Sequence, residues 1–314
     1  MGRLEQRFPG ARNRPFAATI APFVLAAGLV AATSALYGAN ESATQPFSRG
    51  LLYRLDKPGV APSYVFGTLH SGDARVTQYP KPVADALDAS KTLALEIQFG
   101  ERDAQEIFAS AQFADGRRLT DFFDTASLAS IRAALGAVAP ADDVFVRLKP
   151  WAVLLRLGED PVGADRETLD ERLLAEAKRR RLFVIGLEMA EEQISAFDTI
   201  PLATQVALVQ FVLVHRAALA RDHDAVIAAW LGRDLAELAA LNAAPGRAYP
   251  EMAVHFAELT RHLIDNRSVQ MAHRLFLPLR AGRVFVAVGA LHLYGTRGLL
   301  ALLKAQGYRV STVY

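Results

Sequence analysis

Two copies of one short pattern, a buried-looking strand that runs into Gly-x-x-His, constrain how this chain of 314 residues can fold. The first copy is "SYVFGTLH", which ends at His70, and the second is "RVFVAVGALH", which ends at His292. In each copy a run of β-branched and aromatic residues stops at a glycine, Gly67 or Gly289, and glycine permits a tight exit from a strand. The two histidines can meet only if their strands lie close together in one sheet.

The other sequence patterns predict an α/β fold with a mixed, partly parallel central sheet flanked by helices. Further strands are expected at 51–58, 91–98, 182–188 and 308–314, and helices at 80–90, 168–181 and 295–307. The spacing of apolar residues in 104–157 and 194–274 is mostly helical, so we expect a helix-rich middle segment with several short helices. Ligands of such sheets bind at the carboxyl ends of the strands, where both Gly-x-x-His patterns fall.

Residues 1–40 predict a signal peptide or an N-terminal membrane anchor. A head with four arginines precedes an uncharged stretch, 15–40, that is long enough to cross a bilayer. Basic residues before such a stretch place the following chain outside the cytoplasm, so we expect a periplasmic or other extracytoplasmic protein that contacts the membrane through this segment. Residues 41–50 are expected to form a linker, and 51–314 a single α/β domain.

Composition and missing motifs exclude several classes of site. The chain has no cysteine, which removes disulfides, thiolate metal sites and cysteine nucleophiles. Its 35 basic and 33 acidic residues nearly balance and its arginines are dispersed, so no nucleic-acid partner is expected. The chain lacks G-x-S-x-G, P-loop and G-x-G-x-x-G patterns, which argues against a serine hydrolase and against nucleotide-binding loops.

Glu96 is the third candidate site residue, because it interrupts the apolar strand expected at 91–98. A buried carboxylate is costly unless it is paired or bound to a metal ion. Two histidines and one glutamate form a ligand set known from hydrolytic zinc sites and from iron or manganese sites. A metal ion held by His70, His292 and Glu96 would lower the pKa of a bound water. The alternatives are a structural histidine at each strand end and a glutamate that meets an arginine.

Arg267 lies on a predicted helix before the second motif and is a candidate clamp for a substrate carboxylate or an oxyanion. Its alternative role is a surface ion pair. Glu188 and Gln193 follow the strand at 182–188, where they either line the same crevice or cap the next helix. The remaining histidines lie in helical stretches without an HExxH pattern and are weaker candidates for metal ligands: His215, His223, His255, His262 and His273.

Taken in order, several segments together resemble the TraB/PrgY/GumN family over about 51–314. They are "GTLH", "LEI", "KPW", "GLEMAEEQ", "NRSVQMA" and "VAVGALHLYGTRGLLALLKAQGYRV". This family includes the Tiki-type metalloproteases, in which two Gly-x-x-His motifs and a glutamate form a divalent-metal site for peptide hydrolysis. The resemblance implies that His70, His292 and Glu96 bind Mn²⁺, Co²⁺ or Zn²⁺. It also implies an α/β fold like that of the erythromycin esterase and ChaN group.

The resemblance also implies a role for Arg267 in catalysis. The family often has Arg-Asn where this chain has Arg267–Ser268, so a role that requires the asparagine does not carry over. The expected function is a metal-dependent hydrolase of peptides or proteins, with Glu96 as metal ligand or as general base. One alternative is a non-catalytic protein that sequesters a peptide or small molecule, and another is a metal-independent esterase with His70 as base. A shared metal ion requires the three side chains to lie within roughly 4–7 Å of one another.

Overall fold

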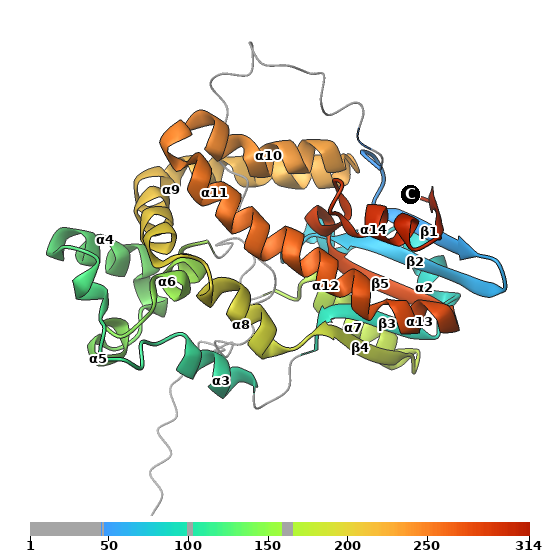
Figure 1. Ribbon diagram of the computed structural model, residues 1–314, viewed down its shortest axis with the longest axis horizontal. Helices are drawn as coiled ribbons and strands as arrows, with labels where there is room; N and C mark the ends of the chain where they lie inside the picture. The colour runs from blue at the N-terminus through green and yellow to red at the C-terminus, as the bar shows by residue number, and fades with distance from the viewer. Residues whose placement is uncertain (1–44, 46, 99–102, 159–165) are drawn as a thin grey trace, which may run out of the picture.

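The computed structural model describes residues 45, 47–98, 103–158 and 166–314. In these residues the chain has an α/β fold built on a six-stranded mixed sheet, as the sequence predicts (Figure 1). The segment expected to be a signal or anchor, 1–40, lies outside the described residues, and of the expected linker only 45 and 47–50 are described.

The sheet has the strand order β4-β3-β5-β2-β1-β6. Its strands are β1 (Leu52–Lys57), β2 (Val60–Thr68), β3 (Thr92–Ile97), β4 (Phe183–Glu188), β5 (Val284–Gly289) and β6 (Arg309–Thr312). Strands β4, β3, β5 and β2 are parallel, whereas β1 pairs antiparallel with both β2 and β6. Because β5 inserts between β2 and β3, Thr68 at the end of β2 is in register with Gly289 at the end of β5.

The central strands are buried because helices pack on the sheet. Every residue of β5 is buried, as expected for a parallel strand that is covered on both faces. Helices α12 (Asn266–Arg274), α13 (Phe276–Ala281) and α14 (Leu299–Ala305) contact the strands and cross in front of the sheet in Figure 1. Helices α2 (Lys81–Asp88) and α7 (Leu169–Arg179) add Leu87 and Leu173 to the same core.

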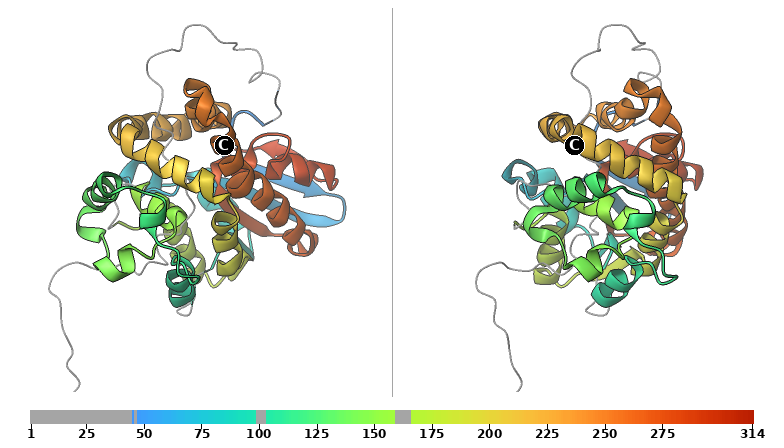
Figure 2. Two further views of the ribbon diagram at one scale, coloured as in Figure 1. Left: turned by 60° about the vertical axis from the view of Figure 1, so that its left-hand side comes forward. Right: turned by 90° about the vertical axis from the view of Figure 1, so that its left-hand side faces the viewer.

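A second core holds the helix-rich middle of the chain together. It is formed by α3 (Asp103–Ser110), α4 (Thr125–Leu135), α5 (Asp142–Phe145), α6 (Pro150–Leu157), α8 (Ala190–Asp198), α11 (Ala253–Thr260) and the first part of α9 (Leu202–Leu231). Trp151 is fully buried at the start of α6, stacks on Phe197 and donates its indole N–H to Asp198 at 2.9 Å. The views of Figures 1 and 2 show these helices gathered at one end of the sheet. The β1–β2 turn lies at the opposite end, so β2 points its carboxyl end toward them.

The prediction of several short helices over 194–274 is wrong for α9, which is one helix of 30 residues. No glycine or proline occurs between Leu202 and Leu231, so nothing in the sequence interrupts the helix. Its segment Leu202–Leu219 is apolar and long enough to cross a membrane, by length and composition alone. Leu208, Val209 and Val212 of that segment are buried in the second core. We therefore describe α9 as a core helix.

Candidate functional site

Polar side chains gather at the carboxyl ends of the parallel strands. His70 lies two residues after β2, Glu96 lies within β3, and Glu188 is the last residue of β4. His292 lies in the 3₁₀ turn Ala290–Leu293 that follows β5, and Arg267 reaches the group from α12. All five side chains are nearly or fully buried. The structure therefore brings together His70, Glu96, His292 and Arg267, and of the two alternatives for Glu188 it places this residue in the same cluster.

The Glu96 carboxylate is the point on which the two imidazoles converge. Its Oε1 atom lies 3.7 Å from His70 Nε2 and 3.8 Å from His292 Nε2. The same oxygen accepts a hydrogen bond of 2.6 Å from the backbone N–H of Gly289. The neighbouring strand ends thus bring both imidazoles to within 4 Å of one carboxylate oxygen.

Close contacts at this site leave little room for a side chain at either motif glycine. A Cβ on Gly289 would lie 3.3 Å from both Glu96 Oε1 and His70 Nε2, so it would fill the space between these groups. A Cβ on Gly67 would lie 2.9 Å from the side chain of Leu293 and would obstruct the turn that carries the second histidine. The repeated glycine therefore does more than let each strand end, because it also lets the two motifs approach one another.

Arg267 compensates the charge of two buried carboxylates. Its Nη2 atom donates to Glu96 Oε2 and to Glu188 Oε2, each at 2.6 Å, and its Nε donates to Glu188 Oε1 at 3.0 Å. Its Nη1 donates to the Leu263 carbonyl at 3.2 Å, and Gln193 donates to Glu188 Oε2 at 3.1 Å. Arg267 is only 6% exposed, so the alternative of a surface ion pair is wrong. All three of its nitrogens are bound to the protein itself.

Ser268 determines which nitrogen of His292 carries the proton. The Ser268 hydroxyl donates its single proton to the Ile264 carbonyl at 2.7 Å, and its oxygen lies 2.9 Å from His292 Nδ1. The hydroxyl must therefore accept a hydrogen bond from Nδ1–H, which leaves a lone pair on Nε2 facing Glu96. Burial lowers the pKa of the His292 imidazole to about 4, so this side chain is neutral at pH 7.

The position of Ser268 depends on a single π-helical turn, Arg261–Asp265, between α11 and α12. A π-turn holds one more residue than a normal helical turn and so rotates the residues that follow it around the helix axis. Arg267 and Ser268 are the second and third residues after this turn, and both are buried. The local irregularity thus aims two polar side chains at the site.

Asp170 contacts Nδ1 of His70, as Ser268 contacts Nδ1 of His292. Its Oδ2 atom lies 2.7 Å from His70 Nδ1, a close ion-pair contact that lies off the hydrogen-bond direction. Thr68 donates to the other oxygen of Asp170 at 2.9 Å and holds the carboxylate in place. Burial lowers the pKa of His70, but Asp170 and Glu96 outweigh burial and raise that pKa to about 9. His70 is therefore protonated at pH 7 when no metal ion is bound.

A model of the TraB/PrgY/gumN family matches residues 51–312. The chain belongs to this family. The resemblance drawn from the ordered motifs is thereby confirmed, and both Gly-x-x-His motifs lie within the matched region. The chain matches no curated protein and no solved structure at a significant level.

The donor atoms of this TraB/PrgY/gumN protein suit a divalent metal ion. In a tetrahedral shell, bonds of about 2.1 Å place neighbouring donors about 3.4 Å apart, a little closer than the histidine nitrogens lie to Glu96 Oε1. His70 Nε2 is buried without a hydrogen-bond partner, and Gly289 keeps the space beside it open. Within the described residues, no three acidic or histidine side chains already stand in a metal-holding arrangement. Each histidine nitrogen lies only 0.3–0.4 Å farther from Glu96 Oε1 than that spacing of about 3.4 Å.

Sequence reasoning missed Asp170 and Ser268 in this member of the TraB/PrgY/gumN family. Asp170 lies in a capping box in which Thr168 and Glu171 bond to each other's backbone N–H. An acidic residue in the first turn of a helix is common, so nothing marked Asp170 as a site residue. Glu188 was proposed to line the crevice or cap a helix, and it lies in the buried cluster.

The other histidines singled out in the sequence make contacts elsewhere in the family fold. His255 Nδ1 lies 2.9 Å from the Thr204 hydroxyl, and His262 Nδ1 lies 3.2 Å from the Thr199 hydroxyl. His215 packs its ring on an aromatic side chain of α9, with ring centroids 4.3 Å apart. These contacts are typical of structural histidines that join helices.

Proposed function

We propose that this protein is an exported or membrane-anchored metal-dependent hydrolase, a peptidase, with His70, His292 and Glu96 as its metal ligands. One observation carries the proposal: two imidazoles converge on one carboxylate, and each has its other ring nitrogen against an oxygen atom, of Asp170 or of Ser268. Metal-bound histidines almost always donate their other ring N–H to a neighbouring oxygen, which fixes the tautomer and the ring orientation. The His292–Ser268 contact has this form, whereas the His70–Asp170 contact is an ion pair off the hydrogen-bond direction.

The charge of the buried cluster supports a divalent ion. Glu96, Glu188 and Asp170 contribute three negative charges and Arg267 one positive charge, which leaves −3 + 1 = −2 when both histidines are neutral. A divalent cation neutralises that charge, and buried charges are tolerated only when they are paired or bound to metal. Without an ion, the proton on His70 offsets half of the net negative charge of the cluster.

The chain's own residues would prepare the site for hydrolysis. When bound, a divalent ion supplies Lewis acidity toward water and toward a carbonyl oxygen. Asp170 and Ser268 orient the two imidazoles. Burial raises the pKa of the Glu96 carboxyl, but Arg267 and the histidines outweigh burial and hold that pKa well below its usual range. Glu96 is therefore ionised at neutral pH, so its Oε1 can serve as a ligand or accept a proton from water.

The choice of a peptide as substrate rests on the family, whose Tiki-type members are metalloproteases. The extracytoplasmic location rests on the basic head and apolar stretch at 1–40. Arg267 supports the reaction in this proposal by neutralising Glu96 and Glu188. The role of a clamp for substrate or oxyanion would require Arg267 to give up one of these contacts.

The burial of the site favours one alternative, a non-catalytic protein that binds a peptide or a small molecule. His292 and Glu96 are only 2% and 3% exposed, and a substrate must reach them before any hydrolysis. The alternative predicts that metal ions bind and that a peptide is held without being cleaved. The two functions therefore differ in turnover and not in metal binding.

The test is a calorimetric titration of the metal-stripped protein with Mn²⁺, Co²⁺ and Zn²⁺, followed by digestion of a peptide library. We expect one ion per chain, with the affinity weakened at least about a hundredfold in His70→Ala and in His292→Ala, because loss of a supporting contact alone costs 10- to 100-fold. His273→Ala is the matched control, since His273 is exposed on the same helix as Arg267. Equal binding by wild type and both site variants would remove the metal site. Binding without cleavage would select the alternative.

A further inference from the structure

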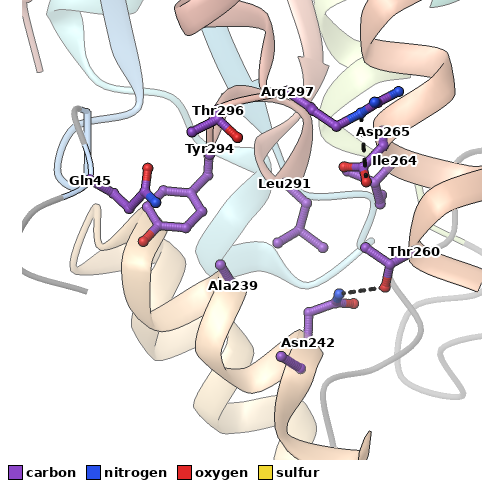
Figure 3. Close-up of a pocket in the computed structure, with 12 residues that line it drawn as sticks. Gln45, Ala239, Asn242, Thr260, Ile264, Asp265, Leu291, Tyr294, Thr296 and Arg297 are labelled. Carbon is purple, nitrogen blue, oxygen red and sulfur yellow. Dashed lines mark hydrogen bonds and ion pairs between the residues drawn. The ribbon is translucent and has the colours of Figure 1, made fainter. Parts of the chain in front are cut away.

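A pocket of about 310 Å³ lies behind the turn that carries His292 (Figure 3). It is bounded by α10 (Leu235–Ala248), the π-helical turn Arg261–Asp265 and the loop after the 3₁₀ turn. Leu291 lines this pocket, whereas its neighbour His292 faces the candidate site and does not line it. A volume of this size is at the lower end for pockets that hold small molecules.

One wall of the pocket carries a loosely held charged pair. Arg297 Nε lies 3.9 Å from Asp265 Oδ2, beyond hydrogen-bond distance, and Arg297 Nη2 lies 3.5 Å from the side-chain oxygen of Asn266. Burial raises the pKa of the Asp265 carboxyl, and Arg297 offsets only part of that rise. Both side chains line the pocket and remain accessible, with 35% of Asp265 and 56% of Arg297 exposed, so a ligand could contact both charges.

The remaining walls combine small, apolar and neutral polar groups. Ala239 and Ala243 stand one turn apart on α10 and leave room, while Leu291 and Ile264 offer apolar surface. In the view of Figure 3, Leu291 projects into the middle of the pocket and the Asp265–Arg297 pair lies beside it. The pocket therefore presents one negative group, one positive group and an aliphatic surface within a small volume.

We propose that this pocket binds a free α-amino acid with an aliphatic side chain. Its ammonium group would pair with Asp265, its carboxylate with Arg297, and its side chain would pack on Leu291. The ammonium and carboxylate of an α-amino acid are bonded to the same carbon and lie about 3 Å apart, so they match two protein charges placed side by side. The ends of an extended dipeptide are too far apart for this, and a neutral sugar carries no charge to pair with either group. The inference goes beyond the proposed hydrolysis and does not depend on it.

The test is a calorimetric titration of the metal-stripped full chain with L-leucine, N-acetyl-L-leucine and L-leucinamide. We expect saturable binding of leucine and at least tenfold weaker binding of each blocked analogue, because each lacks one charge. Asp265→Asn is expected to weaken leucine binding tenfold, and N-acetyl-L-leucine should then bind that variant as well as leucine does. Arg297→Gln is expected to weaken leucine binding tenfold, and L-leucinamide should then bind that variant as well as leucine does.

The matched controls are Asp143→Asn and Arg147→Gln, which alter an exposed ion pair of 3.6 Å at α5. Both should bind leucine as wild type does. The inference is overturned if leucine does not bind at millimolar concentration, if the blocked analogues bind as well as leucine, or if the Asp265 and Arg297 variants bind like the controls.

The metal-site variants separate this inference from the proposed function. A chain with His70→Ala and His292→Ala should lose metal binding and keep its affinity for leucine. If leucine binding is lost in that chain and kept in Asp265→Asn, the ligand occupies the site at the strand ends and the assignment to this pocket is wrong. If metal binding fails in wild type while leucine still binds, only the proposed function is lost.

Discussion

Replacing Arg267 by methionine tests how the buried cluster is held together. The change keeps an unbranched side chain but removes the cation that pairs with Glu96 and Glu188, each at 2.6 Å. Both carboxylates are at most 3% exposed, so they cannot recover their solvation in place. Removal of one partner from a buried ion pair typically destabilises a protein by about 3–5 kcal/mol. We expect at least that loss in the free energy of unfolding at pH 7, measured by urea denaturation.

Arg274→Met is the matched control, because Arg274 lies on the same helix and forms an ion pair with Glu192. That pair has side chains 33% and 24% exposed, so water screens it, and Arg274 also donates to the Leu187 carbonyl at 2.7 Å. Loss of both contacts should cost about 1–2 kcal/mol, less than the loss expected for Arg267→Met. If Arg267→Met destabilises the protein no more than Arg274→Met does, the reasoning from buried charge is refuted.

The pH dependence of the Arg267→Met effect has a definite sign. In wild type the pKa of Glu96 is depressed in the folded state. Its contribution to the free energy of unfolding is therefore present above the unfolded pKa of about 4.3 and is lost as pH falls through the folded pKa. Without Arg267, burial raises the pKa of the Glu96 carboxyl, and protonation of that carboxyl at low pH removes an uncompensated charge. The difference between wild type and variant should therefore be largest near pH 7 and shrink toward pH 4. Adding Glu188→Gln should recover part of the loss at pH 7, because it removes one unpaired charge.

Three further substitutions test the rest of the site. Ser268→Ala removes the acceptor for His292 Nδ1–H and should weaken metal binding about 10- to 100-fold in calorimetry, with circular dichroism unchanged. Gly289→Ala places a methyl group 3.3 Å from His70 Nε2 and should abolish metal binding while leaving a folded protein, which thermal denaturation can verify. Asp170→Asn removes the main cause of the raised pKa of His70. In metal-free wild type, the stabilising effect of that raised pKa is present below about pH 6.5 and is lost as pH rises toward 9. The free energy of unfolding of Asp170→Asn, measured in urea, should not show this decline.

Local sequence patterns were sufficient to predict where the strands lie along the chain, because alternation and β-branched runs are properties of short segments. They could not set the strand order. The insertion of β5 between β2 and β3 pairs segments more than two hundred residues apart, and only tertiary packing decides it. The Gly-x-x-His repetition was informative because both copies end parallel strands, whose carboxyl ends share one edge of the sheet.

The supporting residues were beyond sequence reasoning for physical reasons. The position of Ser268 follows from a π-helical turn, which no helix-forming preference predicts. Asp170 belongs to a helix start whose charge already has a local explanation. The length of α9 was missed, because short helices were expected throughout 194–274 although the chain has no glycine or proline between Leu202 and Leu231.

In the proposed metal site, an ion and a proton would compete for His70, and this competition can be measured. At pH 7 the metal-free site keeps a proton on His70, whose pKa is about 9, whereas His292, with a pKa of about 4, and Glu96 are already deprotonated. A metal ligand must be deprotonated, so binding should release about one proton per ion. The apparent affinity should then rise about tenfold per pH unit from pH 6 and level off near pH 9. Calorimetry in buffers with different ionisation enthalpies counts the released protons directly. An affinity that does not change between pH 6 and pH 9 would show that His70 is neutral before the ion binds, and the assigned role of Asp170 would then be wrong.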